Sequence, residues 1–155
     1  MPEPPNQASV EQALKLWVVL SRAYAAVAAH SQADIARHRG LTPGEFGVLE
    51  ALYHKGPLLL GEVQRKILVT SGGVTYLVDR LVERGLVERR RCERDRRASY
   101  AALTPDGEAF VADIFPAHGE AMRRALAGLD AAQTEEATRL LRALGRHAAD
   151  ASKEG

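Results

Sequence analysis

Arginines are concentrated in one short part of this chain. Between residues 80 and 97, eight arginines stand against four acids, in a protein whose net charge is only +1. From Pro105 onward the balance reverses, with nine acids against six bases. Because guanidinium groups bind phosphates through paired, charge-assisted hydrogen bonds, the basic segment predicts one face for an anionic partner. The candidate anion contacts are Arg80, Arg89, Arg90, Arg94, Arg96 and Arg97.

A set of polar residues begins just before these arginines. Apolar residues at helical spacing predict a helix from about residue 71 to Gly85 whose buried stripe is Val74, Leu77, Val78, Leu81 and Val82. The opposite face then presents Ser71, Gly72, Thr75, Tyr76, Asp79 and Arg80. Hydrogen-bonding groups on a groove-sized helix can read base edges of duplex DNA, while nearby arginines hold its phosphates.

Two residues of that face allow a second interpretation. Asp79 and Arg80 could form an intramolecular salt bridge that fixes the helix to its own domain, instead of contacting DNA. Gly72 and Gly73 would let the backbone approach a ligand closely, although two glycines in a first helical turn lose roughly 1 kcal/mol each relative to alanine.

The elements that must position these residues follow a recognisable order. A short helix from about Leu60 to Ile67 precedes the polar helix, and two extended segments, 86–92 and 98–103, flank a charged tip at 93–97. This order is typical of a winged helix-turn-helix. Helix starts are also predicted by capping patterns at Ser9 with Gln12, Thr42 with Glu45, Thr104 and Asp130, and Thr70 or Ser71 is expected to cap the polar helix. We therefore expect a mainly α fold with a small wing of two or three β-strands.

Other classes of function find no support in the residues. The five histidines (His30, His38, His54, His118 and His147) show no metal-ligand spacing with carboxylates or with the single cysteine. No phosphate-binding glycine loop or nucleophile elbow is present in the sequence. We therefore expect no enzymatic activity, no metal and no cofactor.

The cellular setting is predicted from what the sequence lacks. A single cysteine, Cys92, excludes an intramolecular disulfide and indicates a reducing compartment. The N-terminal residues have no basic region followed by an apolar core, and no apolar stretch approaches ~18 residues. We expect a cytoplasmic protein without membrane contact.

Several short motifs, taken in order, resemble the MarR family of bacterial transcriptional regulators. They are Leu41-Thr42 with Phe46, Val48 and Leu49, then Thr75, Asp79-Arg80-Leu81, Gly85-Leu86-Val87, Asp95-Arg96-Arg97 and Leu103-Thr104-Pro105-Asp106-Gly107. The resemblance spans about Val10 to Leu144. It implies a homodimer in which the first and the last two helices of both subunits interlock. The two winged domains would then straddle pseudo-palindromic double-stranded DNA.

The resemblance also implies a division of the chain. Residues 1–8 would be a flexible N-terminus, 9–40 a dimerisation helix, 41–104 the DNA-binding region, 105–149 the C-terminal dimerisation helices and 150–155 a polar tail. Within the DNA-binding region, the recognition helix is expected at about 71–85 and the wing at about 86–103.

Roles in DNA binding are expected for residues of the helix and of the wing. The recognition helix would enter the major groove from its N-terminal end, with Ser71, Thr75 and Tyr76 bonding base edges or phosphates. The family pattern places a wing arginine in the minor groove. It falls on Arg97 or Arg96, with Asp95 orienting the guanidinium. The arginines at 89, 90 and 94 would add phosphate contacts.

The resemblance suggests a small-molecule effector as well. Family members commonly respond to small aromatic or phenolic ligands bound between the dimerisation helices and the winged domain. The candidate lining residues are Trp17, Tyr24, Phe46 and Tyr53, with ordinary core packing as the alternative for each. We expect a repressor, because a protein that occupies a promoter blocks polymerase without a further partner.

Two alternatives to this function stay open. Other family members sense oxidants through a cysteine, and Cys92 is the only candidate, although it lies in the wing rather than in the first helix. Winged domains also serve as protein-docking modules that do not bind DNA.

Overall fold

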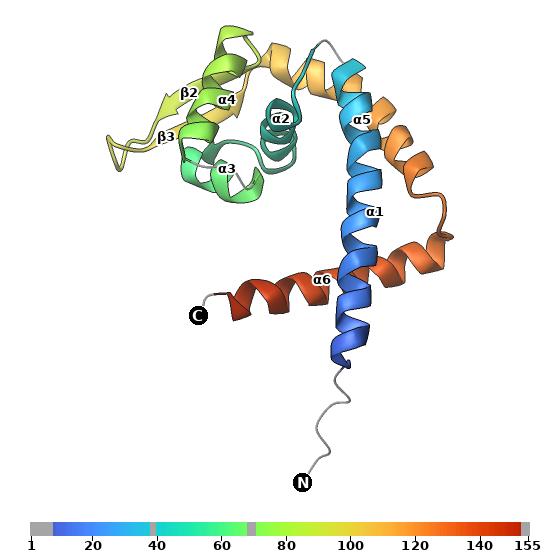
Figure 1. The fold of residues 1–155 in the computed structure, drawn as a ribbon. Coiled ribbons are helices and arrows are strands. Elements are labelled where there is room, and N and C mark those ends of the chain that lie inside the picture. Colours follow the sequence, from blue (N-terminus) through green and yellow to red (C-terminus); the bar gives the residue numbers. More distant parts are fainter. Residues whose placement is uncertain (1–7, 38–39, 68–70, 153–155) are drawn as a thin grey trace. The chain divides into compact units, whose positions relative to one another are not determined.

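The computed structural model describes residues 8–37, 40–67 and 71–152, except for the side chain of Ser71. It divides into a first compact unit that ends at Met122 and a second that begins at Arg123. The elements are α1 (Val10–Arg37), α2 (Pro43–Lys55), β1 (Leu58–Leu59), α3 (Leu60–Ile67), α4 (Ser71–Glu83), β2 (Val87–Arg91), β3 (Ser99–Leu103), α5 (Pro105–Ala125) and α6 (Ala131–Ala151) (Figure 1). The predicted mainly α fold with a small β-wing is confirmed.

The core of the first unit lies between α2, α3, α4, the sheet and the first half of α5. Its fully buried side chains include Val48, Leu49, Leu52, Val63, Val78, Leu81, Val87 and Val111. Helix α1 contributes only its C-terminal end, where Ile35 is 3% exposed. The winged domain therefore has its own core, to which most of α1 adds nothing.

The predicted stripe on α4 is correct except at one position. Val74, Val78 and Leu81 are buried and Leu77 packs against the core. Val82 is 38% exposed, so its predicted burial was wrong. Successive residues on a helix are 100° apart, which places Val82 on the flank of the stripe that Leu81 centres.

The sheet has three antiparallel strands in the order β1-β3-β2. Strand β3 pairs with β1 through Leu58↔Ala101 and with β2 from Val87↔Leu103 to Arg91↔Ser99. Because β1 runs directly into α3, this pairing attaches the base of the wing to the helix-turn-helix. The wing was expected over residues 86–103, which contain β2, its tip and β3.

The helices start where the capping patterns predicted. Reciprocal side-chain and backbone bonds join Ser9 to Gln12, Thr42 to Glu45, and Asp130 to Gln133. Thr70, one of two predicted caps for α4, lies outside the described residues. Helix α4 ends at Glu83, two residues before the predicted end at Gly85. There Gly85 takes φ +72° and the bonds Gly85 N–H to Val82 and Leu86 N–H to Leu81 close the helix end.

Helix α5 begins directly against the turn between α4 and β2. The Thr104 hydroxyl donates to the Gly85 carbonyl at 2.6 Å and accepts from the Gly107 N–H at 3.0 Å. The Thr104 N–H also donates to the Leu86 carbonyl at 3.1 Å. A Cβ placed on Gly107 would stand 1.9 Å from the Leu86 carbonyl oxygen. Glycine is therefore required for this close approach.

Helix α6 makes up most of the second unit and contains no buried residue. In the part of the chain that the structure describes, no helix combines the length and apolar character needed to cross a membrane.

Candidate nucleic-acid interface

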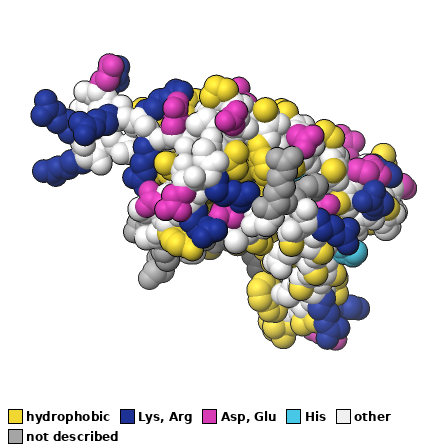
Figure 2. All heavy atoms as spheres, turned by 90° about the horizontal axis from the view of Figure 1, so that it is seen from above, with side chains coloured by type: hydrophobic (Ala, Val, Ile, Leu, Met, Phe, Trp, Pro, Cys, Tyr) yellow, Lys and Arg dark blue, Asp and Glu magenta, His cyan; other side chains and the backbone are white. Residues whose placement is uncertain are grey.

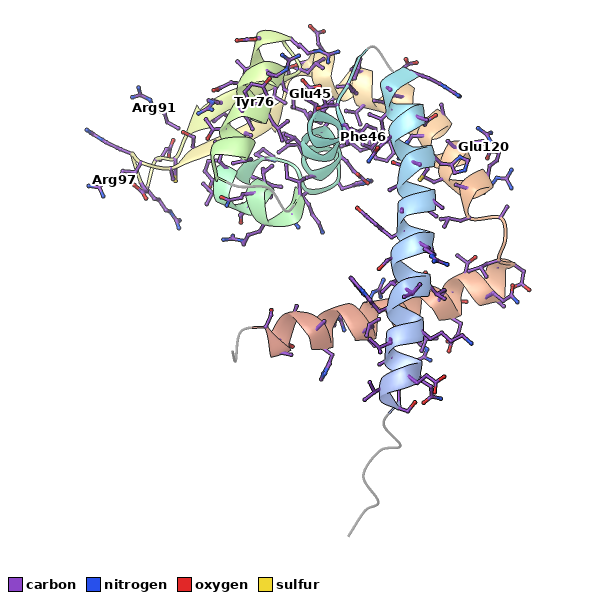
Figure 3. The ribbon with its side chains drawn as sticks, in the orientation of Figure 1. Glu45, Phe46, Tyr76, Arg91, Arg97 and Glu120 are labelled. Carbon is purple, nitrogen blue, oxygen red and sulfur yellow. The ribbon has the colours of Figure 1, made fainter. Side chains whose placement is uncertain are left out.

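The predicted polar residues of α4 share its exposed face. Tyr76 is 61% exposed, and Thr75, Asp79 and Arg80 are exposed beside it. Gly72 has open space where a Cβ would lie, so the backbone of the first turn is accessible. Figure 3 shows Tyr76 on the outside of α4. This face presents hydrogen-bonding groups at the helix end where the dipole also favours an anion.

The tip of the wing is a compact turn between β2 and β3. The Cys92 N–H donates to the Ala98 carbonyl at 3.2 Å, and the Ala98 N–H donates to the Asp95 carbonyl at 3.0 Å. The Asp95 carboxylate accepts the backbone N–H of Arg97 at 2.9 Å, whereas we expected it to hold the guanidinium. Asp95 thus shapes the turn from which the Arg97 side chain projects.

Ion pairing divides the arginines into two groups. Arg80 and Arg84 pair with Glu45, Arg89 pairs with Asp79 at 2.6 Å, and Arg90 pairs with Glu88 at 2.7 Å. Within the described residues no acid pairs with the other four arginines of this region, which are Arg91, Arg94, Arg96 and Arg97. We call these four the wing-tip arginines. All four are exposed, and Figure 2 shows Lys and Arg side chains gathered on the projecting lobe.

The wing-tip arginines include a residue that sequence reasoning did not select. Arg91 is the last residue of β2, and Figure 3 shows it and Arg97 projecting away from the domain. The run of three arginines gave no basis for ranking them, because their pairing depends on acids elsewhere in the fold. The position of Arg91 beside the charged tip was the one feature of the sequence that could have indicated its role.

The pair between Arg89 and Asp79 joins the wing to α4. Both side chains are exposed, at 36% and 57%, so water screens their attraction and its contribution to stability is at most about 1 kcal/mol. The contact matters for geometry, because it connects strand β2 to the helix that carries Tyr76.

A buried carboxylate lies behind α4. Glu45 has no exposed surface, and its Oε1 accepts the Arg80 Nε–H at 2.9 Å. Its Oε2 accepts the Thr42 N–H at 2.8 Å and lies 3.9 Å from Arg84 Nη1. Asp79 and Arg80 were expected either to contact DNA or to form a salt bridge within the domain. Both residues form intramolecular pairs, although not with each other.

The surroundings of Glu45 set its charge. Burial alone would raise its pKa, but the Thr42 N–H bond, the Arg80 bond and the charges of Arg80 and Arg84 together lower the pKa below its ordinary value. The pKa of Arg80 is raised by its bond to Glu45 first and then by the neighbouring Tyr76 phenol. Both groups are therefore ionised at neutral pH.

Sequence reasoning assigned Glu45 only to helix capping. A signal for more was present, because Glu45, Val48, Leu49 and Leu52 are spaced as one face of a helix and the other three are apolar. A carboxylate on an apolar stripe requires a buried partner.

The lowered pKa of Glu45 makes a prediction about acid stability. A carboxyl group with a depressed folded pKa stabilises the protein above its unfolded pKa, ~4.3, and that stabilisation disappears as pH falls through the lower folded value. Glu45→Gln should cost about 1 to 3 kcal/mol at pH 7 and make unfolding less sensitive to pH below about 4.5. Urea unfolding between pH 7 and pH 3 measures both. The exposed Glu83→Gln is the matched control, and equal acid sensitivity of Glu45→Gln and wild type would contradict this account.

Two of the four candidate ligand residues come together. Phe46 and Tyr53 belong to an aromatic cluster with His54, Phe115 and His118, whose ring centroids lie 4.5 to 5.9 Å apart. The His118 Nδ1 contacts Asp34 Oδ2 at 2.9 Å, which joins α5 to α1. Trp17 and Tyr24, by contrast, are 65% and 74% exposed on α1. An open hollow of about 620 Å³ adjoins Tyr53 between α2, β3 and α5.

The single cysteine of the chain lies at the base of the wing tip. Cys92 is half-buried at the end of β2 and is not in a disulfide. Among the described residues, no group of three or more His, Cys, Asp or Glu could hold a metal ion.

These elements together define a class of protein. Helices α3 and α4 form a helix-turn-helix, and the β2–β3 hairpin beside α4 ends in exposed arginines. The first unit is thus a winged helix-turn-helix of the kind that binds duplex DNA.

Comparisons with known proteins identify the family. The MarR family model matches residues 39–98. The transcriptional regulator MhqR of Bacillus subtilis (strain 168) is 41% identical over 138 residues, which cover 89% of this chain and 94% of MhqR. The chain therefore belongs to the MarR family of transcriptional regulators, which are not enzymes.

Solved structures agree with this assignment. Bordetella bronchiseptica BpsR, whose DNA binding is regulated by 6-hydroxynicotinic acid, matches with a TM-score of 0.76 and 30% identity over 84% of this chain and 98% of its own. Streptomyces coelicolor Sco3205, a MarR family regulator solved in complex with DNA, has a TM-score of 0.79. At 24% identity over 94% of this chain and 92% of its own, it shows the same fold. The thiol-sensing and protein-docking alternatives are not favoured by these relatives.

Proposed function

We propose that this protein is a sequence-specific DNA-binding regulator that acts as a homodimer on a pseudo-palindromic operator. The observation that carries the proposal is the set of wing-tip arginines, which are exposed and have no acidic partners among the described residues, beside the polar outer face of α4. An unneutralised cationic lobe next to a groove-sized helix suits a duplex, since phosphates and base edges are then met together.

The roles in binding divide between helix and wing. Helix α4 enters the major groove with its N-terminal half, where Thr75 and Tyr76 bond base edges and the backbone near Gly72 approaches closely. Ser71 is proposed to contribute at the same helix end. Arg97 or Arg96 enters the minor groove, and the remaining arginines of β2 and the tip bind phosphates. Arg80, held by Glu45, supports the reading face rather than acting as a free cation.

Dimerisation is proposed from unpartnered apolar surface. Only one of the 28 residues of α1 is buried, and its exposed apolar side chains are Val10, Leu14, Leu16, Trp17, Val18, Val19 and Tyr24. In the second unit, Leu140, Leu141 and Leu144 form an exposed stripe on α6. Apolar faces of this kind indicate protein interfaces. A second copy of the chain is the partner that covers each of them.

Repression and release form the finer part of the proposal. A dimer bound across a promoter would block access of RNA polymerase. The proposed site of action is the cytoplasm, which contains the DNA. A small aromatic or phenolic effector would lower DNA affinity by its differential affinity for two dimer geometries, usually ~1 to 3 kcal/mol of coupling. Regulation of BpsR by 6-hydroxynicotinic acid supports such an effector, and the aromatic cluster offers stacking groups.

Base reading by α4 makes a direct prediction. Thr75→Ala and Tyr76→Ala should each reduce the preference for particular base pairs by roughly 1 to 3 kcal/mol, because each removes a hydrogen-bonding group from the groove face. Competition binding of each variant to the selected operator and to single base-pair changes measures this preference. Equal losses of affinity on operator and random duplex would show that these residues do not read sequence.

A further inference from the structure

Glu45 is the single buried charged side chain among the described residues. Its position at the start of α2 makes it part of a capping box, but capping does not require a buried charge. The boxes at Ser9 and Asp130 are completed by exposed, uncharged Gln12 and Gln133. Placing a carboxylate out of water costs free energy that only well-formed bonds can offset. The additional partners of Glu45 therefore need a separate explanation.

Those partners lie on α4 and directly after its last residue. One carboxylate oxygen, Oε1, accepts from Arg80, while the other holds Thr42 and faces Arg84. The Arg84 guanidinium carbon also lies 5.9 Å from the centroid of the Phe110 ring of α5. Glu45 thus connects α2 to the last turn of the proposed recognition helix and to the residue that follows it, and Figure 3 shows Glu45 between α2 and α4.

Arg80 carries this connection to the surface. Its side chain is 46% exposed. The Nε–H therefore bonds the buried carboxylate, while the rest of the guanidinium lies among the groups of the outer face. Its guanidinium carbon lies 5.9 Å from the centroid of the Tyr76 ring, four residues earlier and on the same side of the helix. A guanidinium fixed by a buried carboxylate limits where the adjacent aromatic ring can lie, because the two groups attract each other.

We propose that Glu45 is a positioning residue for DNA reading, which acts through Arg80 to fix the ring of Tyr76 on the outer face of α4. The proposal rests on the function proposed above and names a residue that does not itself touch DNA. It predicts that Glu45 affects discrimination between DNA sequences more than affinity for DNA in general. Its influence should depend on the presence of the Tyr76 ring.

A double-mutant cycle tests this dependence. Glu45→Gln keeps the size of the side chain but removes its charge and one of its two acceptor oxygens. In otherwise wild-type protein it should reduce the ratio of affinity for the selected operator to affinity for random duplex by roughly tenfold, the scale of one base-reading contact. In a Tyr76→Ala background the same substitution should change that ratio less than about twofold. Equal reductions in both backgrounds, or an unchanged ratio, would overturn the proposal.

A control separates positioning from loss of stability. Ile114→Val removes one methyl group from a buried site on α5 and should lower the midpoint of urea unfolding. If Glu45 acts only on stability, Ile114→Val should change the affinity ratio as much as Glu45→Gln does. We expect no change in that ratio for Ile114→Val at a temperature where all variants are folded.

A spectroscopic measurement tests the proposal without DNA. In the free protein labelled with 3-fluorotyrosine, Tyr76→Phe assigns the Tyr76 resonance. Glu45→Gln should shift or broaden that ¹⁹F resonance, and Ile114→Val should not. An unchanged resonance would refute the coupling of Glu45 to Tyr76. Absence of any operator preference in the wild type would instead refute the proposed function, and the resonance would still decide the coupling.

Discussion

Replacing Arg94, Arg96 and Arg97 together with glutamine should lower the affinity of the proposed dimer for every duplex at least several hundredfold at about 0.1 M salt. Each arginine that neutralises a phosphate contributes about 0.9 to the slope of log affinity against log salt, so the triple variant should lose about two to three units of slope per wing, and about twice that when both wings of the proposed dimer bind the duplex. The three side chains are exposed and have no acidic partners in the described part of the chain, so their loss should leave the fold intact. Salt-titrated fluorescence anisotropy measures both quantities.

A matched variant distinguishes the loss of wing contacts from the loss of net positive charge. Replacing Arg139, Arg142 and Arg146 of α6 with glutamine removes the same net charge from another exposed surface. This control should change the slope by less than about half a unit, since those side chains neutralise no phosphate in the proposed complex. If wing and control variants weaken binding equally, the wing is not the contact surface.

Gly107→Ala should destabilise the protein by about 3 kcal/mol. The added methyl group would stand 1.9 Å from the Leu86 carbonyl oxygen, which is backbone and cannot rotate away. To relieve this contact, the start of α5 must shift and break the Thr104 bonds to Gly85 and Leu86. Urea unfolding at one fixed protein concentration measures the change, because dimerisation makes apparent stability depend on concentration.

The same helix supplies the control for this prediction. Gly119 lies inside α5 with no other atom near the position of an added Cβ. Gly119→Ala should therefore stabilise the protein by about 0.5 to 1 kcal/mol, through helix propensity alone. The two substitutions thus have opposite expected signs. A Gly107→Ala variant as stable as wild type would show that α5 does not pack against the turn after α4 in the way described.

Features set by local sequence could be predicted well. The starts of α2 and α6 depend on side chains that bond backbone three residues away, so Thr42 with Glu45 identified the first and Asp130 the second. The buried stripe on α4 follows from helical spacing, and its error at Val82 concerns an edge position. The wing was predicted from two extended segments around a charged tip.

Features set by contacts between distant segments could not be predicted. Strand β1 has two residues and exists only because Leu58 and Leu59 pair with Ala101 and Tyr100 of β3. Which arginines remain unpaired depends on acids such as Asp79 and Glu45, brought near them by folding. The partition of the arginines in the candidate interface therefore required the structure.

The candidate ligand residues show the same limit. Phe46 and Tyr53 are seven positions apart on α2 and both contact Phe115 of α5, which spacing alone did not indicate. Trp17 and Tyr24 have the same spacing on α1 but lie exposed. Periodicity predicts which residues share a face of a helix, whereas only the tertiary fold determines what that face meets.

Selection of duplexes from a random DNA library, titrated with salt and accompanied by the mass of the protein in solution, tests whether a dimer of this protein binds a specific DNA sequence. We expect enrichment of a pseudo-palindrome with half-sites about one helical turn apart, bound by a dimer with a steep salt slope. A monomer in solution, or no enriched sequence together with a shallow slope, would contradict it.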